Sequence, residues 1–145
     1  MNYHLRPATD DDYSFCHDLT RQNMDTLVCR HWGGWQDTKF QEDFVAENTV
    51  IIIVADQPVG YLSRKFLGQA IYIDNLQIAS AHRNRGIGTH FLQSLFDEYS
   101  DQTIQLTTFE DNSAKRLYER MGFKIVEKNG FTLTMKKMSR NASDR

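Results

Sequence analysis

One short basic turn, set between an apolar strand pattern and an amphipathic helix pattern, restricts this chain more than any other feature. The turn reads Arg83-Asn84-Arg85-Gly86-Ile87-Gly88-Thr89 and follows an apolar run at 71–78. Glycines let the main chain approach a ligand closely, and free N–H groups at a helix N-terminus attract an anion. The two arginines add positive charge and bidentate donors for phosphate oxygens. The pattern therefore predicts a strand–turn–helix unit that binds phosphate.

The spacing within this turn excludes two common phosphate-binding motifs. A dinucleotide-binding fingerprint, G-x-G-x-x-G, would need a glycine where the chain has Phe91. A P-loop would need Gly-Lys-Ser/Thr, which this turn lacks. The spacing that is present is R-x-x-G-x-G, from Arg83 to Gly88. The alternative is an ordinary strand-to-helix turn with an incidental glycine pair, so the remainder of the chain has to decide between the two.

The first half of the chain contains two helix patterns and several β-branched runs. We expect a strand at 2–6, closed by Pro7, and then a helix opened by the capping-box residues Thr9 and Asp12. The other elements expected before the basic turn are a helix at 38–47 and strands at 50–55, 59–64 and 71–78. The segment 27–37 would then be a linker between the two helices.

The second half of the chain continues the alternation. A helix follows the basic turn, a strand is expected at 103–109, and a further helix begins near Asn112 and ends at Gly122. Strands at 123–128 and 131–136 form a hairpin around Asn129-Gly130. The order is β-α-α-β-β-β-α-β-α-β-β. It predicts an α/β domain whose mixed sheet is flanked by helices.

Composition and charge narrow the class of protein. The chain has 145 residues, of which 40% are hydrophobic and 25% charged, with a net charge of −2 at pH 7. No apolar run approaches the ~20 residues that span a bilayer, and the first residues lack the apolar region of a signal peptide. Cys16 and Cys29 have no C-x-x-C spacing. We therefore expect a cytoplasmic protein with reduced thiols and with neither a nucleic acid nor a membrane as partner.

A second motif lies after the strand at 103–109. The segment from Asn112 to Phe123, which includes Ala114, Tyr118 and Gly122, resembles the motif N-x-x-A-x-x-x-Y-x-x-x-G-F of the GCN5-related N-acetyltransferase (GNAT) superfamily. The basic turn resembles the pyrophosphate loop of the same superfamily, and the order of elements is similar too. The resemblance implies a single acetyltransferase domain at 1–138 with a GNAT-type mixed sheet, followed by a polar tail at 139–145.

The resemblance also implies how acetyl-CoA, the co-substrate, is bound. The main chain of Leu76, Gln77 and Ile78 is expected to pair with the pantetheine arm. A bulge near Asn75-Leu76 would free an N–H group for the thioester oxygen. The N–H groups from Arg83 to Thr89 are expected to hold the pyrophosphate.

Two residues of the second motif are implied to lie near the reacting thioester. Asn112 is expected to contact the pantetheine region, and Tyr118 to protonate the leaving thiolate as general acid, because a phenol with a pKa of about 10 stays protonated at neutral pH. The protein N-terminal branch often carries a Glu five residues before the motif's Asn, and here that position is Thr107. The general base therefore stays open. The candidates are Asp74, Glu110, His31, a water chain or an amine that arrives neutral.

The segment 27–37 carries His31, Trp32 and Trp35 around a glycine pair. One interpretation is that the tryptophans cover the core above the sheet. The other follows from the superfamily, in which the loop between the first two helices commonly lines the acceptor pocket. On that interpretation these three residues, together with Asp74, are the candidate substrate-side residues.

The sequence therefore predicts an acetyl-CoA-dependent N-acetyltransferase, acting on the primary amine of a small molecule as a monomer or homodimer. Transfer would be direct, in a ternary complex, because no Cys or Ser is placed for a covalent intermediate. No metal is expected, since the histidines share no ligand spacing. The alternatives are a protein N-terminal or lysine acetyltransferase, a non-catalytic acyl-CoA-binding domain of the same fold, and a nucleotide-binding protein.

Overall fold

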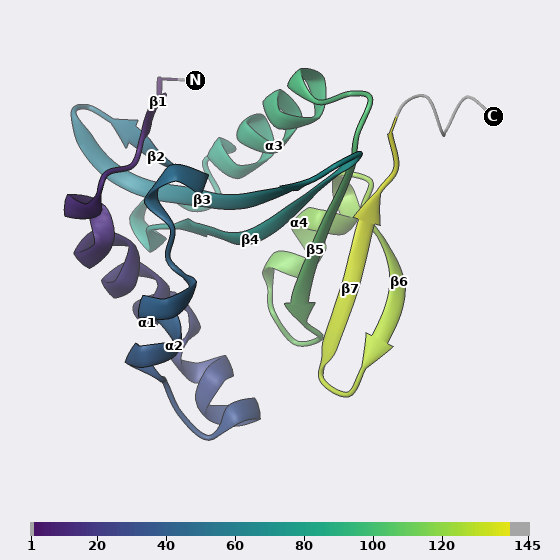
Figure 1. Cartoon of the computed structure of the whole chain (residues 1–145), viewed down its shortest axis with the longest axis horizontal. Helices are drawn as coiled ribbons and strands as arrows, with labels where there is room; N and C mark the ends of the chain where they lie inside the picture. Colours follow the sequence, from purple (N-terminus) through teal and green to yellow (C-terminus); the bar gives the residue numbers. More distant parts are fainter. Residues whose placement is uncertain (1, 140–145) are drawn as a thin grey trace. The chain divides into compact units, whose positions relative to one another are not determined.

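A computed structural model describes residues 2–139, and its helices and strands follow the predicted order (Figure 1). They are β1 (His4–Pro7), α1 (Tyr13–Trp32), α2 (Asp37–Asp43), β2 (Thr49–Val54), β3 (Gln57–Leu67), β4 (Ala70–Ile78), α3 (Ile87–Glu98), β5 (Thr103–Phe109), α4 (Ala114–Arg120), β6 (Lys124–Asn129) and β7 (Thr132–Lys137). Short 3₁₀ turns lie at Asp10–Asp12, Ala46–Asn48 and Ser80–His82. Apart from Ser139, the predicted polar tail lies outside the described residues.

The seven strands form one mixed sheet in the order β1-β2-β3-β4-β5-β7-β6. β4 and β5 are parallel, with Ala70 opposite Thr103 and Ile73 opposite Leu106. The pairs β1–β2, β2–β3, β5–β7 and β6–β7 are antiparallel. Parallel neighbours need a crossover connection, which helix α3 supplies between β4 and β5. The predicted α/β class with a mixed sheet is confirmed.

The described chain forms two compact units. The first contains the chain up to Arg64 together with Asn75–Ile87, and the second contains Lys65–Asp74 together with the chain from Gly88 onward. The boundaries fall within β3, within β4 and after the first residue of α3, so these elements contribute to both units. A single domain at 1–138 stays a prediction.

The start of the first unit is fixed by a charged pair. The N–H of Thr9 donates to Oδ2 of Asp12 at 2.8 Å, which is one half of the predicted capping box. Nη1 and Nη2 of Arg6 donate to the same carboxylate at 2.8 Å each. The Arg6 guanidinium holds the pKa of the buried Asp12 carboxyl below its usual value. The pair therefore joins β1 to the turn that opens α1.

The core of the first unit lies between its helices and β2–β3. α1 contributes Cys16 and Leu19, and α2 contributes Phe40. The strands contribute Ile51, Ile53 and Tyr61 to the same cluster. The hydroxyl groups of Thr20 and Tyr61, both buried, are hydrogen-bonded to each other. This hydrogen bond joins α1 to β3 within the core.

Helix α1 is longer than the sequence pattern predicts. The linker expected at 27–37 is wrong in its first half, because α1 continues to Trp32. No glycine or proline interrupts the segment, and the helix ends where Gly33 adopts the left-handed conformation with φ 83°. Few residues of α1 are buried, so the apolar periodicity that predicts a helix is weak in its C-terminal half. The helix expected at 38–47 is shorter than predicted, because Phe44 becomes extended after Asp43.

The second unit is built on β5, β7 and β6, which stand side by side in Figure 1. Helix α3 buries Phe91, Leu92, Leu95 and Phe96, as its sequence spacing predicts. Gly122 follows α4 with φ 99°, and Gly130 turns the β6–β7 hairpin with φ 62°. The predicted glycine cap and the predicted hairpin are therefore confirmed.

Among residues 2–139 no helix is both long and apolar enough to cross a lipid bilayer. Cys16 is a buried free thiol and Cys29 an exposed one. Burial raises the pKa of the Cys16 thiol to about 12. Cys16 therefore stays protonated at neutral pH and is not a nucleophile.

Candidate functional site

The basic turn has the main-chain form that an anion site needs. Asn84 and Gly86 are both left-handed, with φ 60° and φ 82°, and helix α3 begins directly afterwards at Ile87. Left-handed residues that alternate with right-handed ones turn successive N–H groups to the same side. The side chains of Arg83 and Arg85 are exposed. The N–H of Arg83 donates to the oxygen of Ser80 at 3.3 Å, so the expectation that it holds pyrophosphate is wrong for this one group. The first N–H groups of a helix have no partner within the helix, so the start of α3 can supply main-chain donors beside the two cationic side chains.

The end of β4 lies immediately before this turn. The parallel register with β5 runs from Ala70 to Ile73, while β4 continues to Ile78. Gln77 is buried in this last part of the strand and Ile78 is half-buried. The main chain of residues 76–78 is thus outside the register with β5, as the expected pairing with a pantetheine arm requires. The bulge near Asn75-Leu76 stays a prediction.

Tyr118 lies in the second unit on the inner face of α4. Its side chain is 7% exposed, and burial raises the pKa of its phenol to about 12. Its ring meets Phe123 edge to face, with 5.7 Å between the centroids. A phenol with this pKa is fully protonated at neutral pH. It therefore carries the proton that a general acid must supply, although the raised pKa makes it a weaker acid than an exposed tyrosine.

Asn112 caps the start of α4. Its Oδ1 accepts the N–H of Ala114 at 3.0 Å, and its main-chain oxygen accepts the N–H of Lys115 at 3.0 Å. This is the ordinary role of an Asn before a helix, and it leaves the Nδ2 donors uncommitted to the cap. Counted back from Ala114 and Tyr118, the Asn of the motif N-x-x-A-x-x-x-Y falls on Asp111. The sequence match is therefore displaced by one residue at Asn112.

The structure separates the candidate acceptor residues. Trp35 packs against the core cluster of the first unit and donates from Nε1 to Oδ1 of Asp37 at 2.6 Å. Trp32, the last residue of α1, is 59% exposed. His31 precedes it in the same turn and is half-buried. The core interpretation thus describes Trp35, and the substrate-wall interpretation stays a prediction for Trp32 and His31.

Two of the candidate bases are in ion pairs within the second unit. Glu110 Oε2 lies 2.7 Å from Nζ of Lys128, which holds the pKa of the Glu110 carboxyl below its usual value. Asp74 lies 3.5 Å from Nζ of Lys65. Thr107, five residues before Asn112, faces Thr134 across β5 and β7, and Leu106, five residues before Asp111, is not a carboxylate either. A paired carboxylate with a lowered pKa is a weak base, so the ion pair with Lys128 argues against Glu110, and Asp74 stays a candidate.

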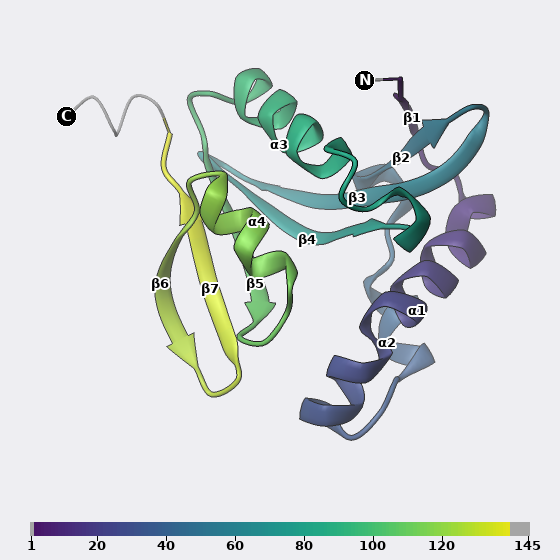
Figure 2. The ribbon, with the colours of Figure 1, turned by 180° about the vertical axis from the view of Figure 1, so that it is seen from behind.

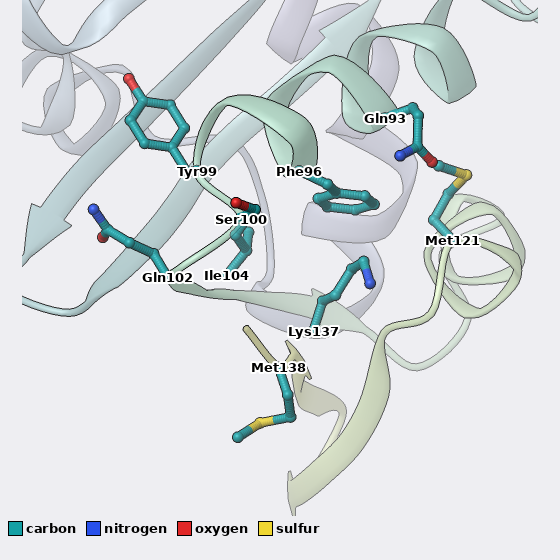
Figure 3. A pocket seen from close by; sticks show the side chains of 9 residues that line it. All are labelled: Gln93, Phe96, Tyr99, Ser100, Gln102, Ile104, Met121, Lys137 and Met138. Carbon is teal, nitrogen blue, oxygen red and sulfur yellow. The ribbon is translucent and has the colours of Figure 1, made fainter. Parts of the chain in front are cut away.

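Within residues 2–139 no group of three or more His, Cys, Asp or Glu side chains is arranged to hold a metal ion. One cavity of about 110 Å³ lies in the second unit (Figure 3). It is lined by Gln93, Phe96, Tyr99, Ser100, Gln102, Ile104, Met121, Lys137 and Met138. None of the predicted site residues is among them. Gln93 and Phe96 of α3 belong to the lining of the cavity.

Two polar clusters of the first unit were not predicted from the sequence. Asn23 of α1 donates to residues at the end of β4. His17 lies between two carboxylates, with Nε2 at 2.7 Å from Oδ1 of Asp37 and Nδ1 at 2.9 Å from Oδ1 of Asp18. No motif marks Asn23 or His17. Their partners are distant in the sequence, except for Asp18, so only the fold reveals these contacts.

Comparisons with known proteins agree with this geometry. The family model of the acetyltransferase (GNAT) domain matches residues 44–125, which is more than half of the chain and includes the basic turn and Tyr118. N-alpha-acetyltransferase 40 of Saccharomyces cerevisiae is 41% identical to the chain over 64 residues. This match covers 37% of the chain and only 22% of the yeast protein.

Solved structures show a similar fold. The PaiA N-acetyltransferase of Thermoplasma acidophilum, in complex with coenzyme A, has a TM-score of 0.74 at 14% identity and covers 95% of this chain and 99% of its own. N-acetylglutamate synthase of Neisseria gonorrhoeae, complexed with coenzyme A and N-acetyl-glutamate, has a TM-score of 0.73 at 13% identity. It covers 95% of this chain and 35% of its own. At these identities the likeness concerns the fold alone.

The chain belongs to the acetyltransferase (GNAT) family, as the family model and the fold together show. The resemblance that the sequence motifs predict is therefore confirmed at the level of the family. The match extends from the end of α2 into β6 and so includes β4, the basic turn and α3.

Proposed function

We propose that this protein is an acetyl-CoA-dependent N-acetyltransferase that moves an acetyl group to a primary amine by direct transfer in a ternary complex. The observation that carries the proposal is the form of the basic turn. Asn84 and Gly86 are left-handed on either side of Arg85, and α3 starts immediately afterwards. Residues 83–89 would hold the pyrophosphate, and the main chain of Leu76, Gln77 and Ile78 would align the pantetheine arm.

The proton steps rest on Tyr118. When the amine nitrogen bonds to the thioester carbon, the carbon–sulfur bond breaks and the sulfur leaves as a thiolate. The Tyr118 hydroxyl donates its proton to that thiolate and is later reprotonated from solvent. Its raised pKa of about 12 favours the protonated form before transfer. Proton removal from the amine is assigned to water or to an acceptor that arrives neutral, because Glu110 is paired with Lys128.

Two classes of acceptor are in question. We place a small-molecule primary amine first, because the Glu of the protein N-terminal branch is missing whether it is counted from Asn112, which gives Thr107, or from Asp111, which gives Leu106. A protein α-amine is the second candidate, and the 41% identity to an N-alpha-acetyltransferase over 64 residues favours it. The exposed Trp32 at the end of α1 is the side chain that we expect to contact either acceptor. The free thiols of Cys16 and Cys29 support a reducing, cytoplasmic setting.

The decisive experiment is a thiol-release assay with acetyl-CoA over a panel of amines, amino acids, polyamines and peptides with free N-termini. Amine-dependent release of CoA thiol is the expected result. Release with small amines alone supports the first acceptor class, and release with peptides alone supports the second. If calorimetry shows binding of ATP or NAD but not of CoA, the acetyltransferase proposal is wrong.

Variants of the donor side separate binding from catalysis. Arg83→Ala and Arg85→Ala should each weaken CoA binding roughly tenfold or more, because a hydrogen bond to a charged group contributes about 1.5–3 kcal/mol. Arg120→Ala, which removes an exposed arginine from α4, is the matched control and should bind as the wild type does. Tyr118→Phe should keep CoA affinity and lose turnover. A non-catalytic acyl-CoA-binding domain would bind CoA in both forms and show no turnover to lose.

A further inference from the structure

The C-terminal end of β4 is tied to helix α1 by one asparagine in the middle of that helix. Nδ2 of Asn23 donates to the main-chain oxygen of Ile78 at 3.1 Å and to Oε1 of Gln77 at 3.1 Å. Gln77 is 9% exposed, and its Nε2 donates to Oδ1 of Asn75 at 3.0 Å. These residues belong to the first compact unit, and Figure 2 shows the end of β4 beside α1.

The same main-chain oxygen also holds the start of the basic turn. Nε of Arg83 donates to the oxygen of Ile78 at 3.1 Å. A carbonyl oxygen has two lone pairs, so it can accept from Asn23 and Arg83 together. The guanidinium of Arg83 retains the N–H donors of its two Nη atoms for another acceptor. One carbonyl group therefore joins the helix, the strand end and the turn.

Strand β3 also approaches the end of β4 closely, at Gly60. A Cβ atom on Gly60 of β3 would lie 2.6 Å from the oxygen of Gln77 and 3.3 Å from Cα of Ile78. The N–H of Ala79 donates to the oxygen of Val59 at 2.8 Å. The strand end at 77–78 thus lies between β3 and the side chain of Asn23, and both contacts restrict its main chain.

We propose that Asn23 is a positioning residue for acetyl-CoA binding. It fixes the main chain at Gln77 and Ile78, and through the oxygen of Ile78 it fixes Arg83 at the start of the phosphate-binding turn. The inference rests on the proposed function, in which these two segments hold the pantetheine arm and the pyrophosphate. In this proposal Asn23 acts through Gln77, Ile78 and Arg83 and makes no contact of its own with the pantetheine arm or the pyrophosphate.

An amide is needed at this position because both partners of Nδ2 are acceptors. Asn23→Asp keeps the shape of the side chain and places an acceptor against the oxygen of Ile78, so this contact becomes repulsive. Asn23→Ala removes both hydrogen bonds without adding charge. Gln22, the exposed neighbour on α1, supplies the matched controls: Gln22→Glu adds the same charge and Gln22→Ala the same truncation.

The test measures CoA affinity by calorimetry and main-chain hydrogen exchange without CoA in the wild type and the four variants. Both Asn23 variants should bind CoA roughly three- to tenfold more weakly, about the effect of one lost hydrogen bond. Exchange should accelerate in a peptide that covers residues 75–79 and stay unchanged in β1 and β2. The Gln22 variants should match the wild type in both measurements. If Asn23→Ala fails to fold, Asn23→Asp retains the packing and carries the test.

Three results would overturn the inference. In the first, the Asn23 variants bind CoA as tightly as the Gln22 controls, in which case the proposed function still stands. In the second, exchange accelerates equally in β1 and β2, so that Asn23 stabilises the unit as a whole and does not position the site. In the third, the wild type itself binds no CoA, and the proposed function fails together with the inference.

Discussion

Gly60→Ala is the substitution for which the structure gives the sharpest expected effect. Replacing Gly by Ala inside a strand ordinarily stabilises a protein by about 0.5–1 kcal/mol, because Gly loses more main-chain freedom on folding. Here the new Cβ would meet the oxygen of Gln77 at 2.6 Å and Cδ1 of Ile52 at 3.3 Å. A carbon–oxygen contact normally measures about 3.3–3.6 Å, so β3 and β4 would have to separate by roughly 0.7 Å.

The two effects oppose each other, and the clash should prevail. Overpacking of this kind costs about 1–3 kcal/mol, so with the middle values of cost and gain a net loss of about 1 kcal/mol is left. For a chain of 145 residues this lowers Tm by about 3 °C. Because the displaced atoms belong to Gln77 and Ile78, CoA affinity should fall as well. Thermal unfolding and calorimetry measure both, and an unchanged or higher Tm would refute the close approach of the two strands.

The remaining predictions concern the α1–α2 region. The carboxylates of Asp37 and Asp18 raise the pKa of His17, so the pair stabilises the fold below about pH 6.5 and loses that contribution as pH rises through the raised pKa. His17→Gln should therefore destabilise the protein at pH 6 and less so at pH 8.5; an equal difference in Tm at both pH values would contradict this. Trp35→Ala should lower stability by about 2 kcal/mol, since its ring packs against the core. Trp32→Ala should change stability by less than about 1 kcal/mol and raise KM for the acceptor, and an unchanged KM would exclude Trp32 from the acceptor site.

The strands and the second half of the chain were predictable because their signals are local. The run 50–55, the glycine cap at Gly122 and the Asn129-Gly130 turn each fix a short stretch with few alternatives, and all three are found. Helix α1 was not predictable in length. Its buried positions are sparse, so periodicity fades well before Gly33, whereas main-chain hydrogen bonding continues to Trp32.

The same difference separates the two sides of the proposed site. The proposed pyrophosphate binding would depend on main-chain geometry, which needs glycine and a left-handed residue at fixed offsets, so the sequence Arg83–Gly88 is enough to predict it. Positioning of the strand end depends on the amide of Asn23, whose partners lie more than fifty residues away. No motif or residue spacing in the sequence predicts that contact.

In the proposed function, recognition of the acceptor would depend on where individual side chains of α1 and its following loop point, and the sequence leaves this undetermined. The sequence does not distinguish Trp32 from Trp35. In the structure Trp32 ends α1 with 59% of its surface exposed, whereas Trp35 packs against Phe40 and His17. Gly33, between them, ends α1 with its left-handed φ, so Trp32 belongs to the helix and Trp35 to the segment that follows it. Substrate choice in this chain should therefore follow changes at the end of α1, whereas acetyl-CoA binding should follow changes at β4 and the basic turn.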